Sequence, residues 1–220
     1  MFVGHLAVGL AAKRATPRVS LAVLLAAAQL ADMLWPAFLA VGIEQMRIDP
    51  GNMPFTSLDF VSYPYSHSLV LLVVWGFVLA GICRLFVSDA RVMIVIPALV
   101  VSHWVLDWVT HRPDMPLYPG GGPKLGLGLW NSIPATLAVE LTMYGVGLWI
   151  YLEATEARDK VGRWAFGTLA VFMVVAYVAS IGSVPPSVPG LYVSAILAAA
   201  LATVWSWWAD RHRMPRRASS

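Results

Sequence analysis

The sequence has little charge and almost no cysteine. Only 12% of its 220 residues are charged, 59% are hydrophobic, and Cys83 is the single cysteine. Soluble domains carry about 25% charged residues, so this composition indicates an integral membrane protein. One cysteine excludes an intramolecular disulfide and a zinc finger. The net charge of +3 is too small to indicate a nucleic-acid partner.

Apolar runs of about 20 residues predict membrane-spanning helices. The N-terminal run, 2–12, is too short to cross, so we expect a half-inserted helix or one lying on the membrane. Its basic residues follow the run, which is not the order of a cleavable signal peptide. No internal repeat or second domain is visible, so 1–220 is interpreted as a single membrane domain. We predict an all-α, polytopic transmembrane helical bundle with about six spans: 20–42, 66–86, 91–110, 131–152, 162–181 and 189–209.

Basic residues are scarce in every second connection between these spans. Twelve of the fifteen fall on the other side, which the positive-inside rule assigns to the cytoplasm. We therefore expect a multi-pass protein of a bacterial-type inner membrane with a cytoplasmic C-terminus, and the long connections 43–65 and 111–130 outside. The twelve are Lys13, Arg14, Arg18, Arg84, Arg91, Arg158, Lys160, Arg163, Arg211, Arg213, Arg216 and Arg217.

Titratable residues are rare in the spans, and those present gather at one depth. Four predicted helices place them in the outer half of the membrane, where ionisable groups usually face the bundle interior and serve function. The central set is Asp32, His67, His103, Asp107 and Glu140, extended by His111 and His5. His212, in contrast, lies in the basic tail and is predicted to be on the surface.

The stretch "SHWVLDWVTH" has a spacing typical of metal ligands. His103, Asp107 and His111 are four residues apart and share one face of a helix. A His-x-x-x-Asp pair can chelate one ion, and histidines combined with carboxylates are a zinc-type ligand set. We predict a divalent metal site that binds one or two ions of zinc. Asp32 could be a ligand or a general base, and His111 could bind a second ion or meet substrate at the rim.

Two other interpretations remain open. The polar layer could be a proton or cation pathway in a transporter, or the protein could be a non-catalytic membrane scaffold. A transporter needs access from both sides, whereas the polar residues crowd the outer half, which favours a one-sided site. In the outer loop, Arg112 and Lys124, with Asn131 at the start of the fourth span, are candidates to bind an anionic headgroup.

Several motifs together resemble a known family. "GHLAVG", Asp32, "YSHS", "SHWVLDWVTH" and "LWNSIPATLAVE" resemble the YdjM-like, LexA-binding family of inner-membrane metal-dependent hydrolases over about 1–150. That family is similar, more distantly, to zinc-dependent phospholipase C and P1 nuclease. The resemblance implies a metal-hydrolase core over 1–152, with two additional helices and a basic tail over 153–220. It also implies a lipid-like or other amphiphilic phosphoester as substrate.

The resemblance also assigns metal ligands. It implies one zinc site from Asp32, His67, His103 and Asp107, part of a second from His111 and Glu140, and a further ligand in His5. Asp32 and Asp107 are the candidate catalytic carboxylates. Two departures favour one or two ions over three. Tyr63 and Tyr65 stand where the family often has His and Arg, and Thr136 stands where a second histidine would precede Glu140.

Overall fold

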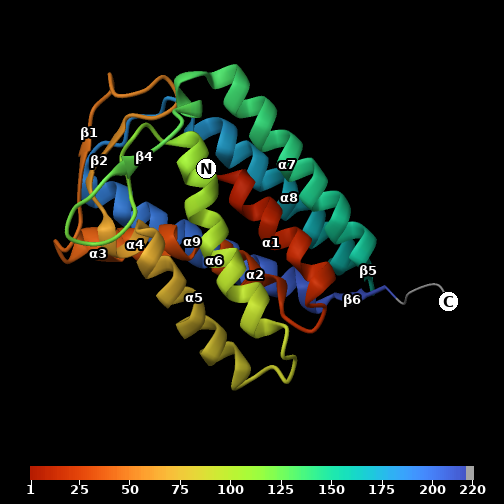
Figure 1. The fold of residues 1–220 in the computed structure, drawn as a ribbon. Coiled ribbons are helices and arrows are strands. Elements are labelled where there is room, and N and C mark those ends of the chain that lie inside the picture. The colour runs from red at the N-terminus through yellow and green to blue at the C-terminus, as the bar shows by residue number, and fades with distance from the viewer. Residues whose placement is uncertain (217–220) are drawn as a thin grey trace.

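The computed structural model describes residues 1–216 and is mostly helical (Figure 1). Arg217, part of the predicted basic tail, lies outside the described residues. The helices are α1 (Val3–Ala15), α2 (Leu21–Ala28), α3 (Leu30–Ala40), α4 (Pro64–His67), α5 (Leu69–Arg84), α6 (Val92–Thr110), η1 (Leu129–Asn131), α7 (Ile133–Ala154), α8 (Lys160–Ser180) and α9 (Val188–Arg211).

Short antiparallel strand pairs lie at both ends of the bundle (Figure 1). At one end β1 (Gln45–Ile48) pairs with β2 (Leu58–Ser62), and β3 (Met115–Pro116) pairs with β4 (Lys124–Leu125). At the other end β5 (Thr155–Ala157) pairs with β6 (Arg213–Pro215), which ties the end of α7 to the segment after α9. The long connections are therefore ordered, and they pack over one end of the helices.

Within the described residues, four helices are long and apolar enough to cross a membrane: α6, α7, α8 and α9. The pair α2 and α3 adds a fifth candidate, bent by 63°. The expected six spans are therefore not reached. The run 66–86 is divided at Ser68, whose backbone is extended, so α5 keeps 16 residues. At 1.5 Å per residue it is about 24 Å long, less than the ~30 Å hydrocarbon layer.

The break between α2 and α3 positions a functional side chain. Gln29 leaves the helical conformation (φ −106°, ψ 12°), and the chain changes direction there. Asp32 falls in the first turn of α3 because of this break. A single straight helix over 20–42 would carry Asp32 along the axis of α2 instead. The bend in this candidate span therefore positions the carboxylate of Asp32.

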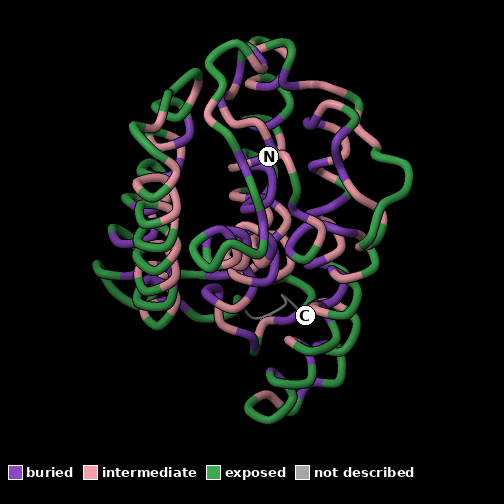
Figure 2. Tube along the Cα trace, turned by 90° about the vertical axis from the view of Figure 1, so that its left-hand side faces the viewer, coloured by how far each residue is buried: buried purple, intermediate pink, exposed green. Residues whose placement is uncertain are grey.

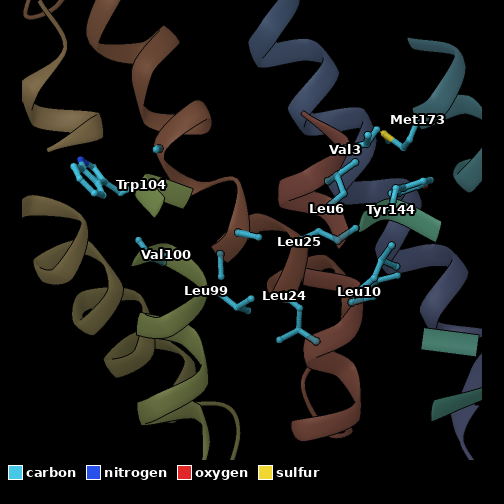
Figure 3. Close-up of a cluster of buried hydrophobic side chains, with 14 of the residues drawn as sticks. Val3, Leu6, Leu10, Leu24, Leu25, Leu99, Val100, Trp104, Tyr144 and Met173 are labelled. Carbon is cyan, nitrogen blue, oxygen red and sulfur yellow. The ribbon is translucent and has the colours of Figure 1, made fainter. Parts of the chain in front are cut away.

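Helix α1 lies inside the bundle, packed along α7 and against α2 and α6. Gly147 of α7 permits the approach, since a Cβ there would lie 2.5 Å from the carbonyl oxygen of Ala7. Segment 2–12 is thus part of the core and does not lie on the membrane surface. Figure 3 shows its side chains among those of α2, α6, α7 and α8: Val3, Leu6, Leu10, Leu24, Leu25, Leu99, Val100, Trp104, Tyr144 and Met173.

Exposure follows the pattern expected of a protein in lipid. Buried stretches gather in the middle of the molecule, while outer helices show long exposed faces (Figure 2). Many exposed side chains on these helices are large and apolar, among them Phe77, Trp164 and Leu197. In water such surfaces would be costly, but hydrocarbon solvates them.

Candidate metal centre

The carboxylate of Asp107 on α6 lies at the centre of a buried histidine cluster. Its Oδ1 lies 3.0 Å from Nε2 of His5, and its Oδ2 lies 3.0 Å from Nε2 of His103. Nε2 of His67 is 3.9 Å away and Nε2 of His111 is 4.0 Å away. All five side chains are buried. Helices α1 and α6, the short α4 and the residue after α6 thus contribute to one point.

The tautomer of His103 follows from its other nitrogen. Nδ1 lies 2.9 Å from the carbonyl oxygen of Ala28 in α2, which can only accept a hydrogen bond. Nδ1 of the neutral ring must therefore carry the proton, and Nε2 presents a lone pair. That lone pair faces a carboxylate oxygen of Asp107 at 3.0 Å. Two acceptors in contact at a buried site repel each other unless a cation lies between them.

The tautomer of His67 is set by a buried carboxylate, that of Glu44, acting through Ser66. The hydroxyl of Ser66 lies 2.6 Å from Oε2 of Glu44 and 2.7 Å from Nδ1 of His67. Oε1 of Glu44 also accepts the backbone N–H groups of Tyr65 and Ser66, each at 2.8 Å. Since the serine hydroxyl donates to Glu44, it accepts from Nδ1 of His67. Nε2 of His67 is again the free lone pair, directed at the cluster.

His111 follows the same rule with a different carboxylate. Its Nδ1 lies 3.0 Å from Oδ1 of Asp114, which also accepts the hydroxyl of Tyr63 at 2.7 Å. Burial, and then the neighbouring Asp114 charge, raises the pKa of Tyr63 well above its usual value, so this phenol stays protonated and donates. Outer partners of this kind fix ring orientation and tautomer at metal sites.

The arrangement fits a divalent cation. Two overlapping groups have ligand atoms within 4.8 Å of one another: His5, His103 and Asp107, and Asp32, His67 and His103. Nε2 of His103 has no hydrogen-bond partner among the described residues, although it is fully buried. Imidazole nitrogens with carboxylates are the ligand mix of zinc sites. The buried His/Asp groups could therefore hold a metal ion, and their donor types fit zinc.

Asp32 differs from the other carboxylates in its exposure. Its Oδ1 lies 3.5 Å from Nε2 of His67 and 3.8 Å from Nε2 of His103, yet its side chain is 41% exposed. It stands between the buried nitrogens and an open cavity. Such a carboxylate can bind an ion or accept a proton from a molecule in that cavity.

Glu140 on α7 lies beside the cluster but contacts the start of α1. Its Oε2 accepts the backbone N–H groups of Phe2 at 2.8 Å and Gly4 at 3.1 Å, while Oε1 is buried without a partner in the described chain. The amino group of Met1 contacts Oδ1 of Asp107. Glu140 thus anchors the segment that carries His5, and it belongs to neither of the two ligand groups.

A cavity of about 280 Å³ opens next to these residues. Asp32, His67, Asp107 and His111 form its polar wall, and the remaining wall is mainly apolar. Ser180 of α8 and Leu191 of α9 contribute, so the helices beyond residue 152 shape the cavity. Its aromatic lining residues are Phe2, Trp35, Phe55, Phe60 and Trp130.

The three predicted headgroup-binding residues lie elsewhere. Arg112 contacts Asp59 and lies 3.3 Å from Asp114, so carboxylates already occupy it. Lys124, in β4, lines a separate cavity of about 320 Å³ that includes the loop 120–122. Asn131 is exposed in η1. None of the three lines the cavity beside the histidine cluster.

Sequence reasoning missed the outer partners of the histidines. Glu44, Ser66 and Asp114 each bear on the orientation of a ring. Asp114 follows His111 by three residues, a spacing that could have pointed to a local pair. Glu44 stands 22 residues before Ser66 in a connection, and nothing in the sequence relates the two. Glu44 reaches Ser66 because the loop that carries Glu44 folds back against α4.

These features define a polytopic helical membrane protein with a buried histidine–carboxylate cluster suited to a metal ion. The sequence pattern of the YdjM inner membrane proteins matches residues 1–185, and the chain belongs to that family. The match extends past the region 1–150 that carries the motifs and includes all of α8. The protein is thus a multi-pass inner-membrane protein. No curated protein and no solved structure was found to match the chain.

Proposed function

We propose that this protein is a metal-dependent hydrolase of phosphoesters, acting on a lipid or another amphiphile. The observation that carries the proposal is the gathering of three Nε2 atoms, from His67, His103 and His111, around the carboxylate of Asp107. When the rings are neutral, the outer partners of their Nδ1 atoms leave three Nε2 lone pairs on the side of Asp107. A bundle built only for stability has no need of three aligned lone pairs around a buried acid.

The residues divide into a holding set and a reacting set. His103, Asp107, His5 and His67 would hold the ion, with zinc as the best fit, and His111 would complete a second position. A divalent ion there supplies Lewis acidity, which polarises a phosphoryl oxygen and acidifies water. Asp32 is the carboxylate with access to the cavity, and it would accept the proton from the attacking water.

The cavity supports an amphiphilic substrate. If the phosphate group of such a substrate lay beside Asp32 and His67, its apolar part would contact Trp35, Phe55 and Trp130. Aromatic walls exclude water from the polar end and strengthen its electrostatic interactions. The positive-inside rule would place this end of the bundle on the extracytoplasmic side, because the basic connections lie at the other end.

The test measures metal and hydrolysis on the same samples. We expect the full chain in detergent to bind about one or two zinc ions per molecule and to release phosphate-bearing headgroups from phospholipid micelles. His103→Ala and Asp107→Asn should lower metal content by more than about tenfold and abolish hydrolysis. His212→Ala is the matched control, because that histidine pairs with Asp159 at the opposite end.

Each result has one interpretation. If the wild-type chain takes up no ion, or both variants keep its metal content while folding normally, the metal site is disproved. Metal binding without hydrolysis across phosphodiesters and phosphomonoesters would reject the enzyme. Ion flux in liposomes that His103→Ala abolishes would identify a transporter instead.

A further inference from the structure

A third cavity, at the end of the molecule opposite the histidine cluster, is surrounded by cationic side chains. It has a volume of about 240 Å³ and lies where α1, α7 and α9 end and β5 pairs with β6 (Figure 1). Five cations and one carboxylate line it, a net charge of +4. The charged residues are Lys13, Arg18, Arg158, Arg211, Arg213 and Asp210. We refer to this group as the basic pocket.

Both oxygens of the carboxylate in the basic pocket accept hydrogen bonds from protein groups. Oδ2 of Asp210 accepts from Nζ of Lys13 at 2.8 Å and from the backbone N–H of Leu21 at 2.9 Å. Its Oδ1 accepts the hydroxyl of Tyr151 at 3.1 Å. The pair of Lys13 and Asp210 is therefore self-compensated and joins α1 to α9. The arginines of the basic pocket keep their charge.

Arg213 is a buried cation whose charge no carboxylate of the described chain neutralises, although the rings of Tyr151 and Phe166 lie against it. Its side chain is buried, and its guanidinium donates to the hydroxyl and carbonyl oxygens of Thr155 and to the carbonyl oxygen of Gly162, each at 3.1 Å. All three acceptors are neutral, and in the described chain no carboxylate lies within 4.0 Å of it. A buried charge is costly unless a counter-charge accompanies it.

We propose that the basic pocket binds a phosphate group, supplied by an anionic phospholipid headgroup or by a soluble phosphate compound. Guanidinium forks match phosphate oxygens in geometry as well as in charge. Basic pockets between membrane helices are known to accept anionic headgroups. Trp207 and Trp208, both about half exposed, lie one turn before the end of α9, where aromatic rings mark a membrane interface. Arg211 lies over the ring of Trp207 at 4.8 Å, which places this cation at the same level.

Two arginines allow a test without damage to the fold. The side chains of Arg18 and Arg158 are exposed, line the basic pocket and make no side-chain hydrogen bond within the described chain. Arg14 and Arg163 are exposed basic residues near the same end that do not line it, so Arg14→Gln with Arg163→Gln is the charge-matched control. Treatment of the wild-type protein with a chelator separates this site from the histidine cluster, which could bind phosphate through a metal.

The experiment uses the full chain, delipidated in neutral detergent. Native mass spectrometry would compare binding of phosphatidylglycerol, phosphatidylcholine and inorganic pyrophosphate. We expect the anionic lipid to bind more tightly than phosphatidylcholine, and affinity to fall about fivefold for each of Arg18→Gln and Arg158→Gln. The chelator-treated wild-type protein and the control pair should keep wild-type affinity.

The arms distinguish the source of the phosphate. Tight binding of phosphatidylglycerol with weak binding of pyrophosphate supports a lipid site, and the reverse supports a soluble phosphate. If neither anion binds better than phosphatidylcholine, or if the control pair weakens binding as much as Arg18→Gln with Arg158→Gln, the basic pocket is not a phosphate site.

Discussion

The two ends of this bundle hold their buried charge in opposite ways. At the histidine end, imidazole nitrogens and the amino group of Met1 surround the carboxylate of Asp107, and the cluster could hold a metal cation. At the basic end, Arg213 donates to neutral acceptors and lies against the rings of Tyr151 and Phe166, and we propose an anion as the ligand of the cavity beside it. One end thus gathers groups that suit a cation, and the other gathers groups that suit an anion.

Helix α1 connects the two ends. It carries His5 near its start and Lys13 near its end, eight residues apart, or about 12 Å along the axis. Both side chains are buried, and each contacts a carboxylate. A short helix that could not cross a membrane is thereby held inside the bundle by a contact with a carboxylate near each end. What looks like an incomplete span serves to align two charged sites.

Removing a metal ion should have the largest effect, and only at the histidine end. An ion bound at 100 times its Kd stabilises a protein by about 2.7 kcal/mol, which corresponds to a Tm shift of about 5–10 °C. We expect a chelator to lower the Tm of the zinc-loaded protein by that amount. Asp107→Asn should show no chelator effect. If the chelator leaves the Tm of the zinc-loaded wild-type protein unchanged, the histidine end does not hold a stabilising cation.

Separating α1 from α7 should disturb both ends together. A Cβ on Gly147 would lie 2.5 Å from the carbonyl oxygen of Ala7, whereas a Cβ on Gly145 meets nothing within 4 Å. Gly147→Ala should therefore cost about 1–3 kcal/mol in overpacking and weaken both metal and anion binding. Gly145→Ala should be neutral or stabilising by about 0.5–1 kcal/mol, because alanine favours a helix interior. Equal Tm values for the two variants would show that α1 is not held by close packing.

The sequence pattern accounts for part of the histidine cluster, whereas the six expected spans are not reached. His103, Asp107 and His111 are spaced by four, and this periodicity alone places them on one helical face. The meeting of Asp32 and His67 with them was expected from a shared depth in the membrane, and that of His5 only from the family resemblance. Glu140 was expected in the same layer but belongs to neither ligand group. The bend at Gln29 and the division at Ser68 were missed, because hydropathy averages over a window and does not register one non-helical residue. The basic pocket depends on β5 pairing with β6, a contact between distant segments with no local pattern.

An outer partner should affect the histidine end less than a ligand does. Glu44→Gln keeps the shape of the side chain but removes the charge that receives three hydrogen bonds around Ser66 and His67. We expect metal affinity to fall about 10–100-fold. Titration with a fluorescent competitor for zinc would measure the change. Glu153→Gln is the control, since this carboxylate is half exposed beside Arg216. If both variants bind zinc as the wild type does, Glu44 stabilises the loop and has no role in metal binding.

An exposed pair at the basic end should have the smallest effect. Oδ2 of Asp159 lies 2.8 Å from Nδ1 of His212, and its Oδ1 caps α8 through the backbone N–H of Gly162. The hydrogen bond with His212 is the main cause that lowers the pKa of Asp159. Its folded pKa is below the unfolded value of about 3.9, so its contribution to stability is present above that pH and lost as the pH falls through the folded pKa.

Asp159→Asn keeps the capping oxygen and removes the charge. We expect the Tm of the variant to lie slightly below that of the wild type at pH 5, and the gap to close as the pH falls below about 4. Scanning calorimetry between pH 3 and pH 5 would measure it. A gap that does not narrow between pH 5 and pH 3, or one as large as the effect of zinc removal, would contradict the difference between the two ends, since it would give an exposed ion pair the weight of a buried one.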